Sequence, residues 1–334
     1  MSQMEHRTLG RTGREVSVVG LGTWQLGADW GEVSEDDARA VLEASAEAGV
    51  TFYDTADVYG DGRSEQLVGR FVAAHPDAGF TVATKMGRRA EQVPASYVEA
   101  SFREWLDRSR TNLGVDTIDL VQLHCPPSEV IDADETYDVL DRLVEDGVIA
   151  AYGVSVETAA QALSAIARPH VASIQIILNA FRMKPLDEVL PAAAAAGVGI
   201  IARVPLASGL LSGKYDLDTS FAEDDHRNYN RDGSAFDVGE TFSGVDYATG
   251  VEAAQEFSAL VSDAGLSDVT PAQAAIAWVC QQPGVSTVIP GARNVDQAAS
   301  NAAAGQVGEL PASFLDGVAE LYDRRIRAQV HGRW

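Results

Sequence analysis

The sequence predicts a single (β/α)8 barrel formed by residues 1–334, and three observations support this fold class. Short runs rich in β-branched residues alternate with amphipathic helical patterns at a spacing of about 30 to 40 residues, which is typical of a parallel sheet built from βα units. Eight such runs can be placed along the chain, the number that a closed barrel needs. No internal domain boundary is evident, and closed barrels of this length commonly form one domain.

The predicted elements begin with a hairpin and continue with the eight barrel strands. The hairpin strands are expected near residues 6–9 and 15–18, joined by the turn sequence Gly10-Arg11-Thr12-Gly13, and this hairpin would close the bottom of the barrel. Ser34, followed by three acidic residues, is typical of a helix N-terminus, and Gly49 ends the same helical pattern. The barrel strands are expected near residues 19–22, 50–53, 81–84, 118–123, 151–154, 173–175, 199–202 and 287–289.

One segment, at about residues 215–250, breaks this rhythm. It is rich in Asp, Gly, Phe and Tyr and shows no clear period. A loop this long inside a compact domain is usually functional or mobile, although an inert surface insertion is the alternative. Because it follows the seventh strand, we expect it to rise over the open mouth of the barrel as a lid or a substrate wall.

A doubly wound dinucleotide-binding fold is the rival architecture. It would need a GxGxxG sequence directly after its first strand. The nearest match, Gly20-Leu21-Gly22-Thr23-Trp24-Gln25, lacks the last glycine. The sequence therefore favours the barrel.

The composition excludes several classes of partner. The formal net charge is −24, and only three of the 25 basic residues are Lys. A surface this acidic repels nucleic acid and anionic membranes, so we expect neither as a partner. A GC-rich coding genome or adaptation to high salt would each account for this bias. No apolar stretch reaches the roughly 18 residues of a membrane helix, and the polar start lacks the apolar run of a signal peptide. Cys125 and Cys280 match no metal spacing, so we expect free thiols, no metal and a cytoplasmic protein.

Four polar residues are expected at or just after the ends of three neighbouring barrel strands: Asp54, Tyr59, Lys85 and His124. A tyrosine can protonate a carbonyl oxygen near neutral pH only if its pKa is lowered from about 10. A nearby ammonium group does this by favouring the phenolate, and a carboxylate can hold the ammonium in place. An imidazole that faces the same point can orient the carbonyl. The set therefore indicates proton transfer to or from a carbonyl group.

In the contexts FYDTADVYG, TVATKMG and LHCP, these four residues resemble the tetrad of the aldo-keto reductase superfamily, and the similarity covers nearly the whole chain. The resemblance implies that Tyr59 is the general acid in reduction and the general base in oxidation. Lys85 would lower the pKa of Tyr59, Asp54 would pair with Lys85, and His124 would orient the carbonyl. Hydride would pass directly from the nicotinamide to the carbonyl carbon without a metal.

The nicotinamide end of the family's cofactor site is matched by three motifs. Gly22-Thr23-Trp24 matches a turn that borders the nicotinamide and the substrate, as Asp54 also would. Ser155 and Gln175 match residues that hold the carboxamide, whereas Val156 replaces the usual Asn. Asn179 is as consistent with a structural role as with a functional one.

The remaining cofactor contacts are implied by two later segments and the long loop. Residues 203–214 resemble a family motif whose backbone approaches the pyrophosphate, with Arg203 stacking on the nicotinamide. Arg293 would clamp a 2′-phosphate, and Arg227 could close over the cofactor from the long loop. The other contacts implied are Val204, Pro205, Leu206, Ser208, Gly209, Leu210, Lys214, Gly291, Gln297 and Asn301.

We therefore expect an NADP(H)-dependent reductase of small aldehydes or ketones, a monomer or weak homo-oligomer. Arg203 and the sequence GLLSGK resemble the bacterial members related to potassium-channel β subunits and general stress proteins, rather than the aldose reductase branch. Trp24, Trp30, Val58, Tyr59 and residues beside Phe80 would form a general apolar pocket. Two alternatives remain: an NADP(H)-sensing regulatory subunit with residual reductase activity, and a Schiff-base aldolase that uses Lys85 as nucleophile. Pairing of Lys85 with Asp54 would disfavour the aldolase because it keeps the lysine charged.

Overall fold

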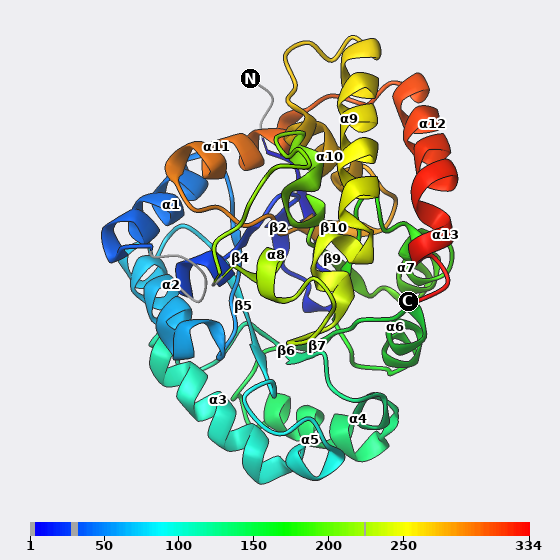
Figure 1. Ribbon diagram of the computed structural model, residues 1–334. Coiled ribbons are helices and arrows are strands. Elements are labelled where there is room, and N and C mark those ends of the chain that lie inside the picture. Colours follow the sequence, from blue (N-terminus) through cyan, green and yellow to red (C-terminus); the bar gives the residue numbers. More distant parts are fainter. Residues whose placement is uncertain (1–3, 28–32, 224) are drawn as a thin grey trace.

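A computed structural model describes residues 4–27, 33–223 and 225–334 and forms a barrel of eight parallel strands surrounded by helices (Figure 1). The strands lie side by side in chain order, and bridges between Val19 and Val288 and between Gly22 and Gly291 join the two edges of the sheet. The predicted barrel is therefore confirmed. Its strands are β3 (Leu21–Gly22), β4 (Phe52–Asp54), β5 (Thr81–Met86), β6 (Leu120–His124), β7 (Tyr152–Ser155), β8 (Ser173–Ile177), β9 (Gly199–Arg203) and β10 (Val285–Val288).

The predicted hairpin closes the bottom of this barrel. It consists of β1 (His6–Thr8) and β2 (Glu15–Ser17), which pair antiparallel across a short 3-10 turn. Leu9 and Val16 are fully buried and pack against side chains at the start of the barrel strands, including Phe52 and Leu120. Gly10 has a positive φ of 48°, and a Cβ atom there would lie 2.1 Å from the backbone nitrogen of Gly199. Only glycine allows this close approach.

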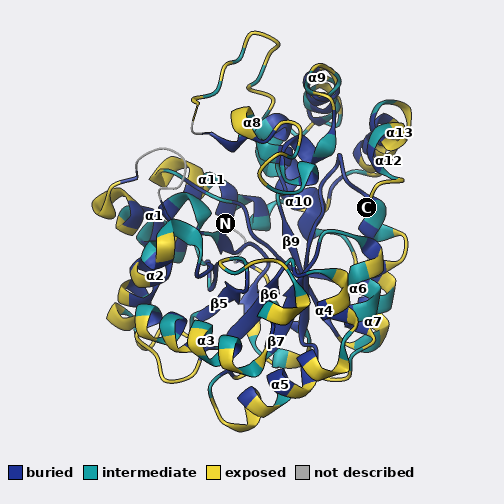
Figure 2. Cartoon of the chain, turned by 60° about the horizontal axis from the view of Figure 1, so that its bottom comes forward, coloured by how far each residue is buried: buried dark blue, intermediate teal, exposed yellow. Residues whose placement is uncertain are grey.

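The helices cover the outside of the barrel and bury the faces that they turn toward the strands (Figure 2). As predicted, Ser34 caps the first helix by accepting a hydrogen bond from the Asp37 amide. The helices are α1 (Glu35–Glu47), α2 (Arg63–Ala74), α3 (Glu99–Leu113), α4 (Ser128–Asp132), α5 (Asp134–Glu145), α6 (Ala159–Ile166), α7 (Val189–Ala196), α8 (His226–Tyr229), α9 (Tyr247–Asp263), α10 (Pro271–Cys280), α11 (Val295–Ala303), α12 (Ala312–Leu321) and α13 (Arg327–Val330). Within the described residues, no helix is long and apolar enough to cross a membrane.

Three predicted boundaries need correction. The long segment at 215–250 follows β9 as expected, but it contains α8 and two 3-10 turns, and its last residues already belong to α9. Lys85 lies one residue inside β5 rather than after it, because this strand continues to Met86. The last strand starts two residues earlier than predicted, and its register shifts between Val285 and Thr287.

Candidate active site

Asp54, Lys85 and Tyr59 form one hydrogen-bonded group at the carboxyl ends of neighbouring strands. Asp54 ends β4, and Tyr59 begins the 3-10 turn η3 (Tyr59–Gly62) after it. The Lys85 ammonium donates to Asp54 Oδ1 at 2.5 Å, to the Thr55 carbonyl at 2.9 Å and to the Tyr59 hydroxyl at 3.3 Å. His124 ends β6, and its ring lies edge-on to Tyr59 with the ring centroids 5.9 Å apart. The structure therefore brings together all four residues predicted from the sequence.

Burial changes the expected proton affinities. It raises the pKa of Tyr59 above the usual value of 10, and the opposing charge of Lys85 offsets only part of this effect. The Lys85 charge lowers the pKa of Tyr59 as predicted, but burial outweighs it, so the expected net lowering of this pKa is not found. Burial and the positive charges of Arg88, Lys85 and Arg203 place the pKa of His124 well below 6.5. Near neutral pH the site therefore holds a protonated phenol and a neutral imidazole.

Two buried glutamines lie beneath this group and hold the carboxylate of Asp54. Gln122 and Gln175 donate side-chain hydrogen bonds to Asp54 Oδ2 at 3.1 Å and 2.8 Å. Gln175 also donates to Gln122 Oε1 at 3.2 Å. The side-chain amide nitrogen of Gln175 thus holds the Asp54 carboxylate in place, a role that the sequence did not predict. Its predicted contact with a carboxamide stays a prediction.

Arg203 lies in a buried network of charges beside the tetrad. Its guanidinium pairs with Glu157 at 3.1 Å and with Glu240 at 2.6 Å, and it also donates to the Val156 carbonyl. Arg88 approaches the same Glu157 carboxylate at 3.4 Å. In this structure Arg203 is therefore engaged by two carboxylates, and its predicted stacking on a nicotinamide would have to occur within this network.

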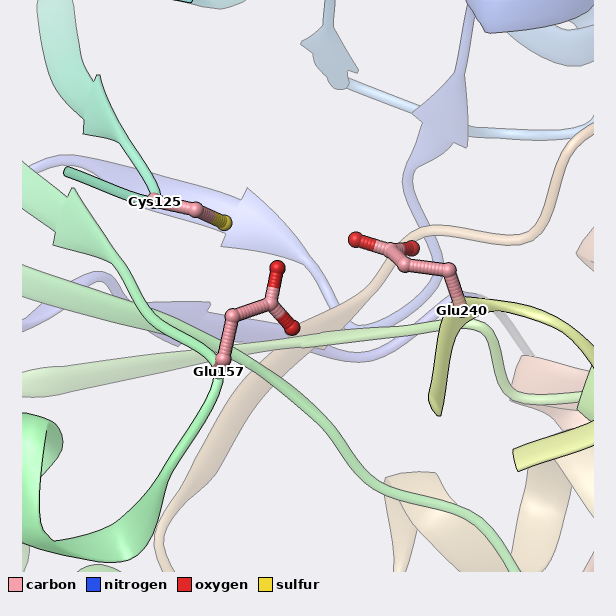
Figure 3. A group of neighbouring side chains, drawn as sticks. All are labelled: Cys125, Glu157 and Glu240. Atoms are coloured by element: carbon pink, nitrogen blue, oxygen red, sulfur yellow. The ribbon is translucent and has the colours of Figure 1, made fainter. Parts of the chain in front are cut away.

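Cys125, Glu157 and Glu240 point toward one another at the mouth (Figure 3), with ligand atoms within 4.8 Å of each other. Three such groups can hold a metal ion, but here the cation among them is Arg203, whose guanidinium contacts both carboxylates and lies 3.8 Å from the Cys125 sulfur. Burial also raises the pKa of Cys125 to about 12, so the thiol is protonated within this network. The geometry therefore favours an ion-pair network over a metal centre.

The other predicted residues near the nicotinamide end have structural partners. The Ser155 hydroxyl lies 3.5 Å from the Cys125 sulfur. Asn179 donates to the Val204 carbonyl and to the Ser243 hydroxyl, and it accepts from the Phe181 amide. Its role in this structure is therefore structural.

The segment that was expected to approach a pyrophosphate has an unusual backbone. Val204, Ala207 and Ser208 have positive φ values of 55°, 47° and 57°, which is rare for residues with side chains and costly for a β-branched one. The Ser208 hydroxyl donates to the Glu240 carbonyl and accepts from the Phe242 amide, so it anchors the long loop. Lys214, at the end of the segment, is exposed.

The long loop contacts the mouth, but its arginine is held within the loop. The Arg227 guanidinium is engaged by the Asp225 carboxylate and by the Tyr215 hydroxyl, and its carbon lies 4.6 Å from the centroid of Phe221. These contacts tie Arg227 to residues of its own loop, so closure over a cofactor would require them to rearrange. Other residues of the loop do reach the mouth: the rings of His226 and Phe236 lie 5.2 and 6.1 Å from Trp24.

The predicted apolar pocket is only partly supported. Trp24 lies 6.2 Å from the Tyr59 ring, as a residue lining the mouth should. Phe80 packs against Tyr53 and Phe71 just before β5 begins, so the residues beside it lie at the amino end of this strand, away from Tyr59. Trp30 lies outside the described residues.

At the predicted adenosine end, the turn after β10 is tightly organised. Gln297 accepts a hydrogen bond from the Arg293 amide, and Asn301 donates to the Gly291 carbonyl. Asn294 caps the N-terminus of α11. The sequence implied direct cofactor contacts for Gln297 and Asn301, whereas here their side chains hold the turn that carries Arg293.

Asp57 is a buried acid that the sequence did not single out. It is 1% exposed, and its carboxylate oxygens accept no well-formed hydrogen bond from the described residues. Burial and the neighbouring Glu65 carboxylate raise its pKa to about 7, against the opposing charges of Arg89 and Arg108. The unfolded chain would release this proton at about pH 3.9. Asp57 should therefore lower the free energy of unfolding as the pH rises from about 4 to 7.

Asp57→Asn removes this titration and keeps the shape of the side chain. We expect the variant to be more stable than the wild type at pH 8 by about 1 to 3 kcal/mol and to match it at pH 4. Urea denaturation at both pH values measures this difference. Asp77→Asn, at an exposed position, is the matched control and should change neither value. A variant that is equally destabilised at both pH values would contradict the assignment.

Three residues of the site were missed in the sequence. Gln122 lies two positions before His124 in the same strand, so the alternation of a strand could have indicated that both face inward. Glu157 follows Ser155 by two residues, but it lies past the end of β7, where the alternation of a strand no longer applies. Glu240 carried no such signal, because it lies in the long loop and meets Arg203 only in the folded chain.

Comparison with known proteins identifies the family of this chain. The model of the aldo/keto reductase family matches residues 18–323. Aldo-keto reductase YhdN of Bacillus subtilis (strain 168) is 30% identical over 300 residues, which cover 88% of this chain and 86% of that protein. A probable voltage-gated potassium channel subunit beta of Oryza sativa subsp. japonica is 29% identical over 321 residues, with 89% and 90% covered. The structure of glycerol dehydrogenase AKR11B4 from Gluconobacter oxydans matches with a TM-score of 0.76 at 29% identity and covers 97% of this chain and 95% of that one. These findings confirm the resemblance inferred from the tetrad. The chain therefore belongs to the aldo/keto reductase family, whose members are NADP(H)-dependent oxidoreductases.

Proposed function

We propose that this chain reduces small aldehydes or ketones to alcohols with NADPH, using Tyr59 as the general acid. The observation that supports this most directly is the Tyr59 hydroxyl, which lies 3.3 Å from the buried Lys85 ammonium. The neutral His124 cannot replace it as a strong acid, because its pKa is well below 6.5. A protonated phenol is thus the acid of the tetrad that is available near neutral pH.

Each residue of the tetrad has a distinct role in this proposal. Tyr59 gives its proton to the carbonyl oxygen, and the Lys85 charge stabilises the phenolate that remains. Asp54 fixes Lys85, and the two glutamines fix Asp54. His124, being neutral, donates one N–H to the carbonyl oxygen and so orients the substrate. NADPH, when bound, supplies the hydride to the carbonyl carbon.

The residues at the predicted adenosine end fit a phosphate group. Arg293 lies on the turn directly before α11, and its guanidinium can donate two hydrogen bonds to a phosphomonoester. The N-terminus of this nine-residue helix adds backbone donors and a favourable dipole. A cationic fork beside a helix N-terminus suits the 2′-phosphate that distinguishes NADPH from NADH.

Steady-state turnover of 4-nitrobenzaldehyde tests this function, with NADPH and NADH compared under the same conditions. We expect turnover with NADPH. Binding of NADPH without turnover would support the sensing subunit instead. Trapping of a carbonyl substrate on Lys85 by borohydride would support the aldolase, which the 2.5 Å ion pair with Asp54 disfavours because it keeps the lysine charged.

Arg293→Ala should weaken NADPH binding by about 1.5 to 3 kcal/mol, the scale of hydrogen bonds to a charged group. NADH affinity should barely change, because NADH has no 2′-phosphate. The loss should shrink as the salt concentration rises, since part of it is screened attraction. Fluorescence titration of both cofactors at two salt concentrations measures these effects.

Arg324→Ala, which removes an exposed guanidinium on the far C-terminal segment, is the matched control and should leave both affinities unchanged. Equal losses for the two cofactors would contradict the assignment, as would a wild-type protein that prefers NADH. Cofactor choice would then have to come from other cations, with Lys214 and Arg227 the next candidates.

A further inference from the structure

Trp334 is buried against the long loop at residues 215–250, although the two are far apart in the sequence. Its side chain is 8% exposed, and the indole N–H donates to the two carboxylate oxygens of Asp237 at 3.0 and 3.3 Å. The Arg182 guanidinium stacks on the indole, with its carbon 4.1 Å from the ring centroid. A charge-assisted hydrogen bond and a stacked cation on one buried ring are strong constraints on the position of Asp237.

The loop backbone is fitted closely to this ring. A Cβ atom at Gly244 would lie 2.3 Å from the indole of Trp334, and one at Gly239 would lie 2.9 Å from it. The Gly239 amide donates to the Asp237 carboxylate at 2.7 Å, and the Glu240 amide donates to the Asp237 carbonyl at 3.0 Å. Residues 237–244 therefore form a compact turn, and its Asp237 end is fixed by Trp334.

The middle of the same turn reaches the active site. Glu240 pairs with Arg203 at 2.6 Å, and its carbonyl accepts from the Ser208 hydroxyl at 3.0 Å. Arg182, which stacks on Trp334, forms a second connection. It donates to the backbone carbonyl of Glu157 at 2.6 Å, and the side-chain carboxylate of Glu157 is the other partner of Arg203. A continuous set of short contacts thus joins Trp334 to the charges beside the tetrad.

We propose that Trp334 is a positioning residue of the active site: it holds residues 237–244 in place so that Glu240 reaches Arg203. The catalytic part of this inference rests on the proposed reductase function, whereas the structural part does not. Trp334 itself touches neither Tyr59 nor His124. It acts on them through Glu240 and Arg203.

The charges of Glu240 and Arg203 influence the pKa values of Tyr59 and His124. Glu240 contributes to raising the pKa of Tyr59, and Arg203 contributes to lowering the pKa of His124. Displacing Glu240 removes a negative charge from the surroundings of Tyr59, so the phenol should ionise at lower pH. The oxidation of an alcohol needs the phenolate, and its pH–rate profile therefore reports on the position of Glu240.

The first experiment does not depend on catalytic activity. Hydrogen exchange of residues 237–244 is compared in the wild-type chain, Trp334→Ala and Trp334→Phe. We expect exchange to rise roughly tenfold or more in Trp334→Ala and less in Trp334→Phe, which keeps the stacked ring but loses the bond to Asp237. Trp278→Phe, in the buried face of α10, is the matched control and should leave this segment unchanged. Unchanged exchange in Trp334→Ala would overturn the proposal.

The second experiment compares pH–rate profiles for alcohol oxidation in Trp334→Phe, Glu240→Gln and the double variant. We expect both single variants to shift the profile to lower pH, and the double variant to shift it no further than Glu240→Gln alone. Additive shifts, or a normal profile for Trp334→Phe despite faster exchange, would show that Trp334 only stabilises the fold. If the wild-type chain oxidises no alcohol and reduces no aldehyde, the proposed function fails, and hydrogen exchange still decides the positioning role.

Discussion

Tyr59→Phe is expected to lower kcat/KM for aldehyde reduction by at least about 100-fold, the scale of losing a general acid. The substitution removes only the hydroxyl that Lys85 contacts at 3.3 Å and keeps the ring between Trp24 and His124. His124 cannot take over, because it is neutral near pH 7. NADPH affinity should stay close to that of the wild type, since the phenol is assigned to the substrate rather than to the phosphates.

Tyr97→Phe is the matched control for this experiment. Tyr97 is also buried, but its hydroxyl donates to Gln92 and contacts no member of the tetrad. We expect its kcat/KM to stay within a few-fold of the wild type. A Tyr59→Phe enzyme with near-normal turnover would remove the proposed mechanism, whereas equal losses in both variants would indicate a general effect on the fold.

The sequence was sufficient to locate the tetrad because of how a parallel barrel is built. Asp54, Lys85 and His124 lie near the carboxyl ends of three strands that pair in chain order. Their side chains are therefore close together, and this does not depend on the exact lengths of the helices between the strands. The hairpin could be predicted for a similarly local reason, since its turn joins two strands that are adjacent in sequence. Both inferences depended on short-range patterns.

The charge network could not be predicted in the same way. Glu240 meets Arg203 from a loop without periodicity, and Trp334 reaches that loop from far along the chain. No spacing rule connects these positions, because the contacts depend on how side chains pack after the barrel has formed. The sequence instead suggested that Arg203 was available for stacking, while the fold surrounds it with two carboxylates.

The proton affinity of Tyr59 shows a second limit. The sequence indicated a nearby ammonium and hence a lowered pKa, but it gave no measure of burial. In the structure burial is the largest influence and raises the pKa, and the Asp54 carboxylate adds to it. The sign of a pKa shift in such a site depends on this balance, which becomes visible only when the depth of the group and all its charged neighbours are known.

Lys85→Met is expected to reduce aldehyde turnover about as strongly as Tyr59→Phe, roughly 100-fold, for an electrostatic reason. Without the ammonium, both burial and the Asp54 charge act to raise the pKa of Tyr59, with nothing at Lys85 to oppose them. Residual alcohol oxidation, which needs the phenolate, should therefore require higher pH than in the wild type. The pH–rate profile for oxidation measures this shift, and an unchanged profile would show that Lys85 does not tune the phenol.

Loss of stability must be separated from loss of catalysis in this variant. Lys85 and Asp54 are 1% and 2% exposed, and removing one partner of a buried ion pair costs about 3 to 5 kcal/mol. The double variant Asp54→Asn/Lys85→Met removes both charges, and the two glutamines can still bond to the new amide. We expect this double variant to recover much of the stability lost in Lys85→Met without recovering turnover. If activity returned together with stability, Lys85 would serve the fold rather than the chemistry, and the acidity of Tyr59 would have to be controlled by the rest of the site.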